Sequence, residues 1–159
     1  MITSAHFKDE TLPVTLIENF RAVFYAPFYA AFALGAYESE GVDVRLEMSA
    51  AADKTLTGLL TGTGHVSWGG PMRLMHALDE NPGSGLVGFC EVVGRDPFYL
   101  LGREPNDSFR MNDLTGKTLA VVSEVPTPWY CLQHDLRCTG IDPVGVRRAP
   151  ARSMVENVE

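Results

Sequence analysis

The chain has 159 residues, of which 45% are hydrophobic and 21% charged, and this composition excludes a disordered or low-complexity protein. Its 20 acidic and 13 basic residues give a net charge of −7. Because Lys and Arg are not clustered, the sequence argues against nucleic acid as a partner. No apolar run reaches the roughly 18 residues of a membrane-spanning helix, so no membrane span is expected.

The first fifty residues contain two predicted strands with a helix between them. Residues 14–17 are rich in β-formers and predict an opening strand. Residues 27–34 have Pro in the first turn and are apolar nearly all round, which predicts a buried helix that ends at Gly35. Residues 42–48 alternate apolar and charged side chains, the period of a half-buried strand.

The next fifty residues continue this alternation. Asp53 can cap a helix that runs to about residue 61. We then expect a strand, a helix and two further strands, at residues 65–68, 71–79, 85–93 and 97–101. Cys90 lies in the apolar run at 85–93, where a buried core thiol is the expected state.

A polar stretch at residues 104–108 is the best candidate for a domain crossing. After it we expect a buried strand at 117–122, a helix at 128–138 and a last strand at 144–147. Strands that alternate with helices predict βαβ units and an α/β fold. Ser153 and Glu156 form a capping box, but the helix that it begins has one turn, so we expect the chain to end within an element.

Two patterns suggest cofactors, and neither has the context that its chemistry requires. Residues 83–88 match the dinucleotide fingerprint, but they follow a predicted helix and precede a strand, so we interpret them as a turn. Cys131, His134 and Cys138 share one helix face, but no fourth zinc ligand is suggested. We therefore expect no cofactor and no metal, and no catalytic Ser/His/Asp arrangement is recognisable.

Two loops fit a small ligand better. Residues 68–71 (Trp-Gly-Gly-Pro) join a predicted strand to a helix, with uncovered amides beside a flat apolar wall. The alternative is a strained turn with Trp68 in the core. Residues 124–129 form a second loop of this kind, in which Thr127 can cap the helix and also bind a ligand. Ligands of open α/β sheets bind at such strand ends.

These segments, in this order, resemble one family. The likeness begins with a first strand at residues 14–19, followed at 26–46 by an Ala-Pro-aromatic helix start and a Gly-aromatic-x-x-x-Gly turn. It continues with a small-Gly segment at 59–70, an Asp-Leu-x-Gly-Lys strand entry at 113–122 and a Gly-apolar-Asp turn at 140–143. Together they resemble the solute-binding proteins of the nitrate/sulfonate/taurine and thiamine-pyrimidine class. His65 stands where that family usually has Asp.

The resemblance implies a type II periplasmic-binding-protein-like fold with two lobes and mainly parallel sheets. Residues 1–103 would form the first lobe without its return segment, and residues 104–159 would begin an incomplete second lobe. The implied function is binding of a small organic or anionic solute, such as a pyrimidine, sulfonate or aromatic acid, in an interlobe cleft for an ABC permease. Two alternatives are a thiamine-pyrimidine-synthase-like enzyme and a cytoplasmic ligand-sensing domain. That enzyme has a cysteine-rich stretch, and this chain has only Cys90 in a comparable place, which argues against the enzyme.

We expect the ligand to contact residues that follow the strands and begin the helices of both lobes: Asn19, Arg21, Tyr25, Phe28, Trp68, Gly69, Gly70, Glu91, Thr127 and Trp129. Asn19 offers donors and an acceptor, and Trp68 a stacking surface. Arg21 can pair with an acidic group or lie in solvent, Phe28 can belong to the core, and Glu91 can accept a bond or face solvent.

The compartment stays open at this point. The family resemblance implies an extracytoplasmic or periplasmic protein. The first ten residues, however, have neither the basic nor the apolar stretch of a secretory signal, so the alternatives are a cytoplasmic protein and one whose export signal has been removed. The three cysteines are odd in number and widely spaced, which is not typical of a disulfide framework.

Overall fold

The computed structural model describes residues 11–51, 54–95 and 98–158. The predicted helix cap at Asp53 and the start of the predicted strand at Pro97 therefore lie outside the described residues. The chain divides into two compact units: unit 1 consists of Met1–Gly69 and Ser84–Gly94, and unit 2 of Gly70–Gly83 and Arg95–Glu159. The predicted lobe boundary at residues 103 and 104 stays a prediction.

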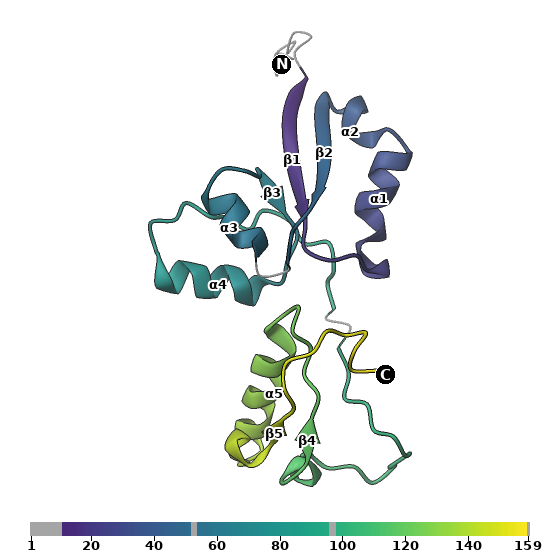
Figure 1. Cartoon of the computed structure of the whole chain (residues 1–159), viewed down its shortest axis with the longest axis vertical. Coiled ribbons are helices and arrows are strands. Elements are labelled where there is room, and N and C mark those ends of the chain that lie inside the picture. Colours follow the sequence, from purple (N-terminus) through teal and green to yellow (C-terminus); the bar gives the residue numbers. More distant parts are fainter. Residues whose placement is uncertain (1–10, 52–53, 96–97, 159) are drawn as a thin grey trace, which may run out of the picture. The chain divides into compact units, whose positions relative to one another are not determined.

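Unit 1 is built on a parallel three-stranded sheet in the order β2-β1-β3 (Figure 1), with strands β1 (Leu12–Glu18), β2 (Val42–Met48) and β3 (Val66–Ser67). Its helices are η1 (Val23–Tyr25), α1 (Ala26–Ala33), α2 (Ala36–Ser39) and α3 (Lys54–Leu60). The central strand β1 is buried from Leu16 onward, whereas β2 alternates half-buried apolar with exposed charged residues from Val42 to Leu46. The strands predicted at 14–17 and 42–48 are thus confirmed, and the one predicted at 65–68 is present but has two of its four residues.

Helix α1 lies where residues 27–34 predict it, but it is not buried as expected. None of its residues is buried, and the following Leu34 is 81% exposed. The helix packs against the core of unit 1 through Phe28, Tyr29 and Phe32. Among the described residues, no other element buries the opposite face of α1. An apolar composition shows that a helix prefers burial, but not that another element is there to bury it. Gly35 ends the helix in the left-handed region, at φ 63°, as predicted.

Residues 84–94 also belong to unit 1, and the strand predicted at 85–93 is wrong. The segment forms no strand, and Val87 and Phe89 are 77% and 72% exposed. No described strand pairs with it, and an unpaired strand leaves its backbone groups without partners. Cys90 is exposed rather than a buried core thiol. Residues 98–101, the described part of the other predicted strand, are not a strand either.

Unit 2 contains two helices, a short parallel sheet and two 3₁₀ turns: α4 (Pro71–Glu80), η2 (Met111–Leu114), β4 (Thr118–Leu119), α5 (Thr127–Cys138), η3 (Pro143–Gly145) and β5 (Arg147–Arg148). The helices predicted at 71–79 and 128–138 are confirmed. Leu132 and Leu136 of α5 form the core with Val146, and Trp129 packs against them.

The strands of unit 2 are shorter than expected. Strand β4 has two of the six residues predicted, although a parallel bridge between Val122 and Arg152 extends the pairing. The first half of the strand predicted at 144–147 is the turn η3, because the Asp142 side chain accepts a hydrogen bond from the Val144 amide (3.0 Å) and stabilises that turn. Arg147, at the end of the predicted strand, belongs to β5. The capping box forms as predicted, with the Glu156 amide donating to Ser153 Oγ (3.2 Å).

The described residues therefore form an α/β protein with small parallel sheets, as predicted. In the part of the chain that the structure describes, no helix is both long and apolar enough to cross a membrane.

Candidate ligand site

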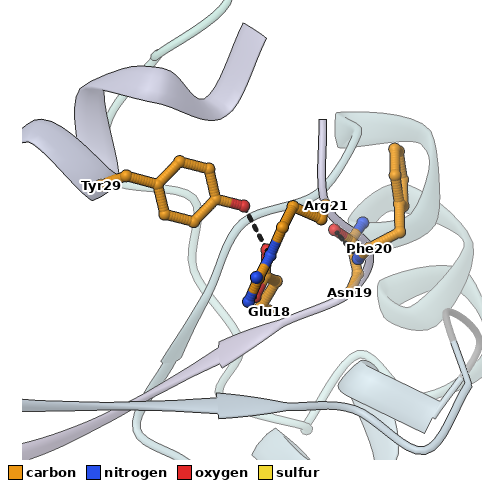
Figure 2. A network of polar contacts seen from close by, with 5 residues as sticks. All are labelled: Glu18, Asn19, Phe20, Arg21 and Tyr29. Carbon is orange, nitrogen blue, oxygen red and sulfur yellow. Dashed lines mark hydrogen bonds and ion pairs between the residues drawn. The ribbon is translucent and has the colours of Figure 1, made fainter. Parts of the chain in front are cut away.

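The end of β1 in unit 1 contains an ion pair between a buried carboxylate, Glu18, and an exposed guanidinium, Arg21 (Figure 2). Glu18 is fully buried and accepts hydrogen bonds from Arg21 Nε (3.3 Å) and Nη2 (3.2 Å) and from the Tyr29 hydroxyl. The Arg21 guanidinium also lies 5.8 Å from the centre of the Tyr29 ring. The three residues, called here the Glu18 network, come from a strand end, a loop and a helix.

Hydrogen bonding determines the charge of this network. Burial raises the pKa of the Glu18 carboxyl, but the hydrogen bonds from Arg21 and Tyr29 and the charge of Arg21 outweigh burial and lower it overall. Burial and the hydrogen bond to Glu18 raise the pKa of Tyr29 to about 12. At neutral pH the network is therefore a carboxylate, a guanidinium and a neutral phenol, with no net charge.

Asn19 follows Glu18, and the nitrogen of its side-chain amide has no hydrogen-bond partner among the described residues. It is 4% exposed, and its Oδ1 accepts a hydrogen bond from the Phe20 amide (2.8 Å). Because a backbone N–H can bond only to the oxygen, this contact determines the orientation of the side-chain amide. Asn19 Nδ2 is buried and has no hydrogen-bond partner among the described residues. A buried donor without a partner is costly and calls for an explanation.

Trp68 follows β3 and lies within a group of aromatic rings. Its ring stacks on Phe28, with centroids 4.4 Å apart at 26°, and lies 5.1 Å from Tyr25. The edge of Tyr29 approaches it at 6.0 Å. Trp68 is 6% exposed, which favours the core alternative for this residue, yet its Nε1 also has no hydrogen-bond partner among the described residues.

The strand register brings these two groups to the same edge of the sheet. Strands β1 and β3 are parallel, and their last paired residues are Ile17 and Ser67. The residues that follow on the two strands are Glu18 and Trp68, and Tyr29 contacts both of them. Neighbouring strands lie about 4.8 Å apart. The carboxyl edge of the sheet in unit 1 thus has a neutral ion pair, an aromatic group and two buried donors without partners.

Unit 2 brings together the starts of α4 and α5. Arg73 Nη2 donates to the Glu124 carbonyl (2.8 Å), and a Cβ at Gly70 would lie 3.0 Å from Thr127 Oγ1. Only a residue without a side chain fits there easily. A Cβ at Gly69 would meet nothing within 4 Å. Pro126, not Thr127, is the N-cap residue of α5, so the predicted capping role of Thr127 is wrong.

The remaining predicted site residues lie in different surroundings. Arg21 is paired with Glu18, and Tyr25 and Phe28 belong to the aromatic group of unit 1. Glu91 is exposed and lies in the segment that forms no strand. Trp129 is half-buried in unit 2, with the Arg148 guanidinium 5.1 Å from its ring centre. The contribution of each to ligand binding stays a prediction.

Sequence reasoning missed two residues of this edge, Glu18 and Tyr29. The signal for Glu18 was present: a carboxylate ends a strand whose three preceding residues are apolar or β-branched, so burial with a partner was the expected state. Tyr29 had no comparable signal, because its neighbours in the sequence are all apolar.

Comparisons with known proteins agree with the expected family. A family model described as "NMT1/THI5 like" matches residues 23–155. Over 137 residues the chain is 28% identical to "Putative binding protein YtlA" of Bacillus subtilis (strain 168), which covers 86% of this chain and 41% of that protein. The chain thus spans less than half the length of this relative. No solved structure gives a significant match. Because the family model covers most of its residues, the chain belongs to the NMT1/THI5-like family.

Proposed function

We propose that this chain binds a small organic or anionic solute as the substrate-binding component of an ABC importer, on a type II periplasmic-binding-protein-like fold. Membership of the NMT1/THI5-like family and the parallel sheets support the fold. The printed name of the Bacillus subtilis relative, a binding protein, favours solute binding over the enzyme alternative.

The observation that supports the site best is the pair of buried donors without partners. Asn19 Nδ2 and Trp68 Nε1 follow adjacent strands of one sheet, and neither has a hydrogen-bond partner in the described structure. Each such donor costs about 1–3 kcal/mol when left unsatisfied. A ligand that supplies acceptors removes this cost, so the two donors favour binding at the carboxyl edge of unit 1.

The surroundings indicate the chemistry of this ligand. Two donors require acceptor atoms, such as a ring nitrogen, a carbonyl or an oxyanion. The Glu18 network has no net charge, so no free carboxylate of that network is available to bind a cation. The aromatic group around Trp68 suits a planar body. Pyrimidines and aromatic carboxylates have all of these features, and sulfonates have the acceptors.

Two conservative variants test the donors. Trp68→Phe keeps an aromatic ring but removes Nε1, and Asn19→Asp keeps the acceptor for the Phe20 amide while it replaces Nδ2 by oxygen. We expect both to weaken binding at least tenfold, measured by calorimetry with cytosine, taurine and benzoate as probes. Asn112→Ala, at an exposed position of η2, is the matched control.

The binding titration has two decisive outcomes. Binding of one probe by wild type and Asn112→Ala, and a tenfold loss in both donor variants, supports the proposal. Equal binding in wild type and both donor variants places the ligand elsewhere. Circular dichroism of each variant at the titration temperature separates loss of binding from loss of folding.

A further inference from the structure

Helix α5 places a histidine and a cysteine next to each other on its exposed surface. His134 and Cys138 are four residues apart, which brings their side chains to the same face one turn apart. The distance from His134 Nε2 to Cys138 Sγ is 3.4 Å, and both residues are exposed. Neither side chain belongs to the core of unit 2, which Leu132 and Leu136 supply from the other face.

This separation equals the bite of a tetrahedral metal ion. Zinc binds cysteine sulfur at about 2.3 Å and histidine nitrogen at about 2.0–2.1 Å. At a tetrahedral angle these bond lengths place the two ligand atoms about 3.5 Å apart. We propose that His134 and Cys138 form a two-residue chelate for a thiophilic metal ion such as Zn²⁺ on the surface of α5.

The position in the helix favours a cation. Cys138 is the last residue of α5, at the end of the helix where the aligned peptide dipoles give a partial negative charge. The neighbouring cation, Arg137, is held by Gln133 through a hydrogen bond of 3.2 Å. The backbone of α5 already fixes the spacing of the two ligands, so binding orders little besides two side chains.

The chelate is distinct from a structural zinc site. Among the described residues, no group of three or more His, Cys, Asp or Glu side chains is placed to hold a metal ion. Two protein ligands leave the other coordination positions to water, so we expect an exchangeable ion rather than one required for folding.

Cobalt and zinc titrations of the whole chain test the chelate. Co²⁺ bound to a thiolate gives a charge-transfer absorption in the near ultraviolet, and Zn²⁺ competes for the same site. We expect wild type to show this absorption, Cys138→Ser to lose it, and His134→Gln to bind Co²⁺ at least tenfold more weakly. Cys90→Ser is the matched control, because Cys90 is also an exposed cysteine but belongs to unit 1.

Cys131→Ser tests the two-residue composition, since Cys131 lies on the same face one turn earlier. We expect its Co²⁺ affinity to stay within threefold of wild type. The proposal is overturned by absorption that persists in Cys138→Ser, by unchanged affinity in His134→Gln, or by a tenfold loss in Cys131→Ser or Cys90→Ser. The four positions are exposed, so the variants are expected to fold, which circular dichroism checks.

Discussion

The hydroxyl of Tyr29 donates a hydrogen bond to the carboxylate of Glu18, a residue fully buried at the end of β1. Arg21 binds the same carboxylate through Nε and Nη2. A buried carboxylate is costly without such partners. The three residues therefore hold together the strand end, the following loop and helix α1, which are the elements that position Asn19 and the aromatic group (Figure 2).

Tyr29→Phe removes one donor to Glu18 and leaves the ring in place. Hydrogen bonds to charged groups contribute about 1.5–3 kcal/mol, so we expect the free energy of unfolding to fall by about 2 kcal/mol, measured by urea denaturation. Tyr37→Phe is the control, because Tyr37 is also half-buried, and only burial raises its pKa. An equal loss in the two variants contradicts a specific role for the Tyr29 hydroxyl.

The pKa of Glu18 predicts how stability changes in acid. Its pKa is lowered from 4.5 in the folded chain, so its contribution is present above pH 4.5 and is lost as the pH falls through the folded value. We therefore expect the difference in unfolding free energy between wild type and Glu18→Gln to be larger at pH 7 than at pH 3. Urea denaturation at the two pH values measures it, and a difference independent of pH contradicts the assignment.

Tyr29 predicts a second loss of stability, in alkali. Its pKa is raised from 10.0 to about 12 on folding, so its contribution is complete below pH 10 and is lost as the pH rises toward 12. The difference between ultraviolet titrations of wild type and Tyr29→Phe should show a phenol that ionises well above pH 10. If the two titration curves have the same shape, the phenol does not bind a carboxylate in solution.

A close approach of backbone and side chain predicts the effect of one glycine substitution. A Cβ at Gly64 would overlap Cδ1 and Cγ1 of Ile17, which is buried in β1. Overpacking of this kind costs about 1–3 kcal/mol, so we expect Gly64→Ala to lower the thermal midpoint by several degrees. Gly69→Ala is the matched control, because nothing lies within 4 Å of a Cβ there. Equal midpoints would show that Ile17 moves aside freely.

Local patterns predicted the elements whose period is strong. The alternation of residues 42–48 identified β2, and the helix predicted at 128–138 is α5. The strand predicted at residues 85–93 was wrong because an apolar run shows which residues prefer burial, but not which strand is available to pair with them. Pairing is a property of the whole sheet, and no window of nine residues contains it.

The candidate site was predictable to the same degree. Asn19 and Trp68 were identified because both follow predicted strands, and the structure places them at one edge of the sheet. Their donors without partners were not predictable, since a sequence does not show which buried groups find acceptors. The contact between Glu18 and Tyr29 joins a strand to a helix across 11 residues, a distance beyond any local pattern.

The exposed apolar residues of the segment 84–94 predict that the chain self-associates. Val87 and Phe89 are 77% and 72% exposed, and Val92 lies on the same segment with 38% exposed. Large exposed apolar side chains that lie near one another tend to be buried against another protein molecule. We expect sedimentation velocity at rising protein concentration to show dimers or larger species, and the double variant Val87→Asp, Phe89→Asp to shift the distribution to monomer.

Val23→Asp, at a position 88% exposed in η1, is the control and is expected to associate like wild type. A wild-type chain that stays monomeric at every concentration, with a sharp and high thermal midpoint, would contradict this prediction, because the segment would then be stable in water without cover.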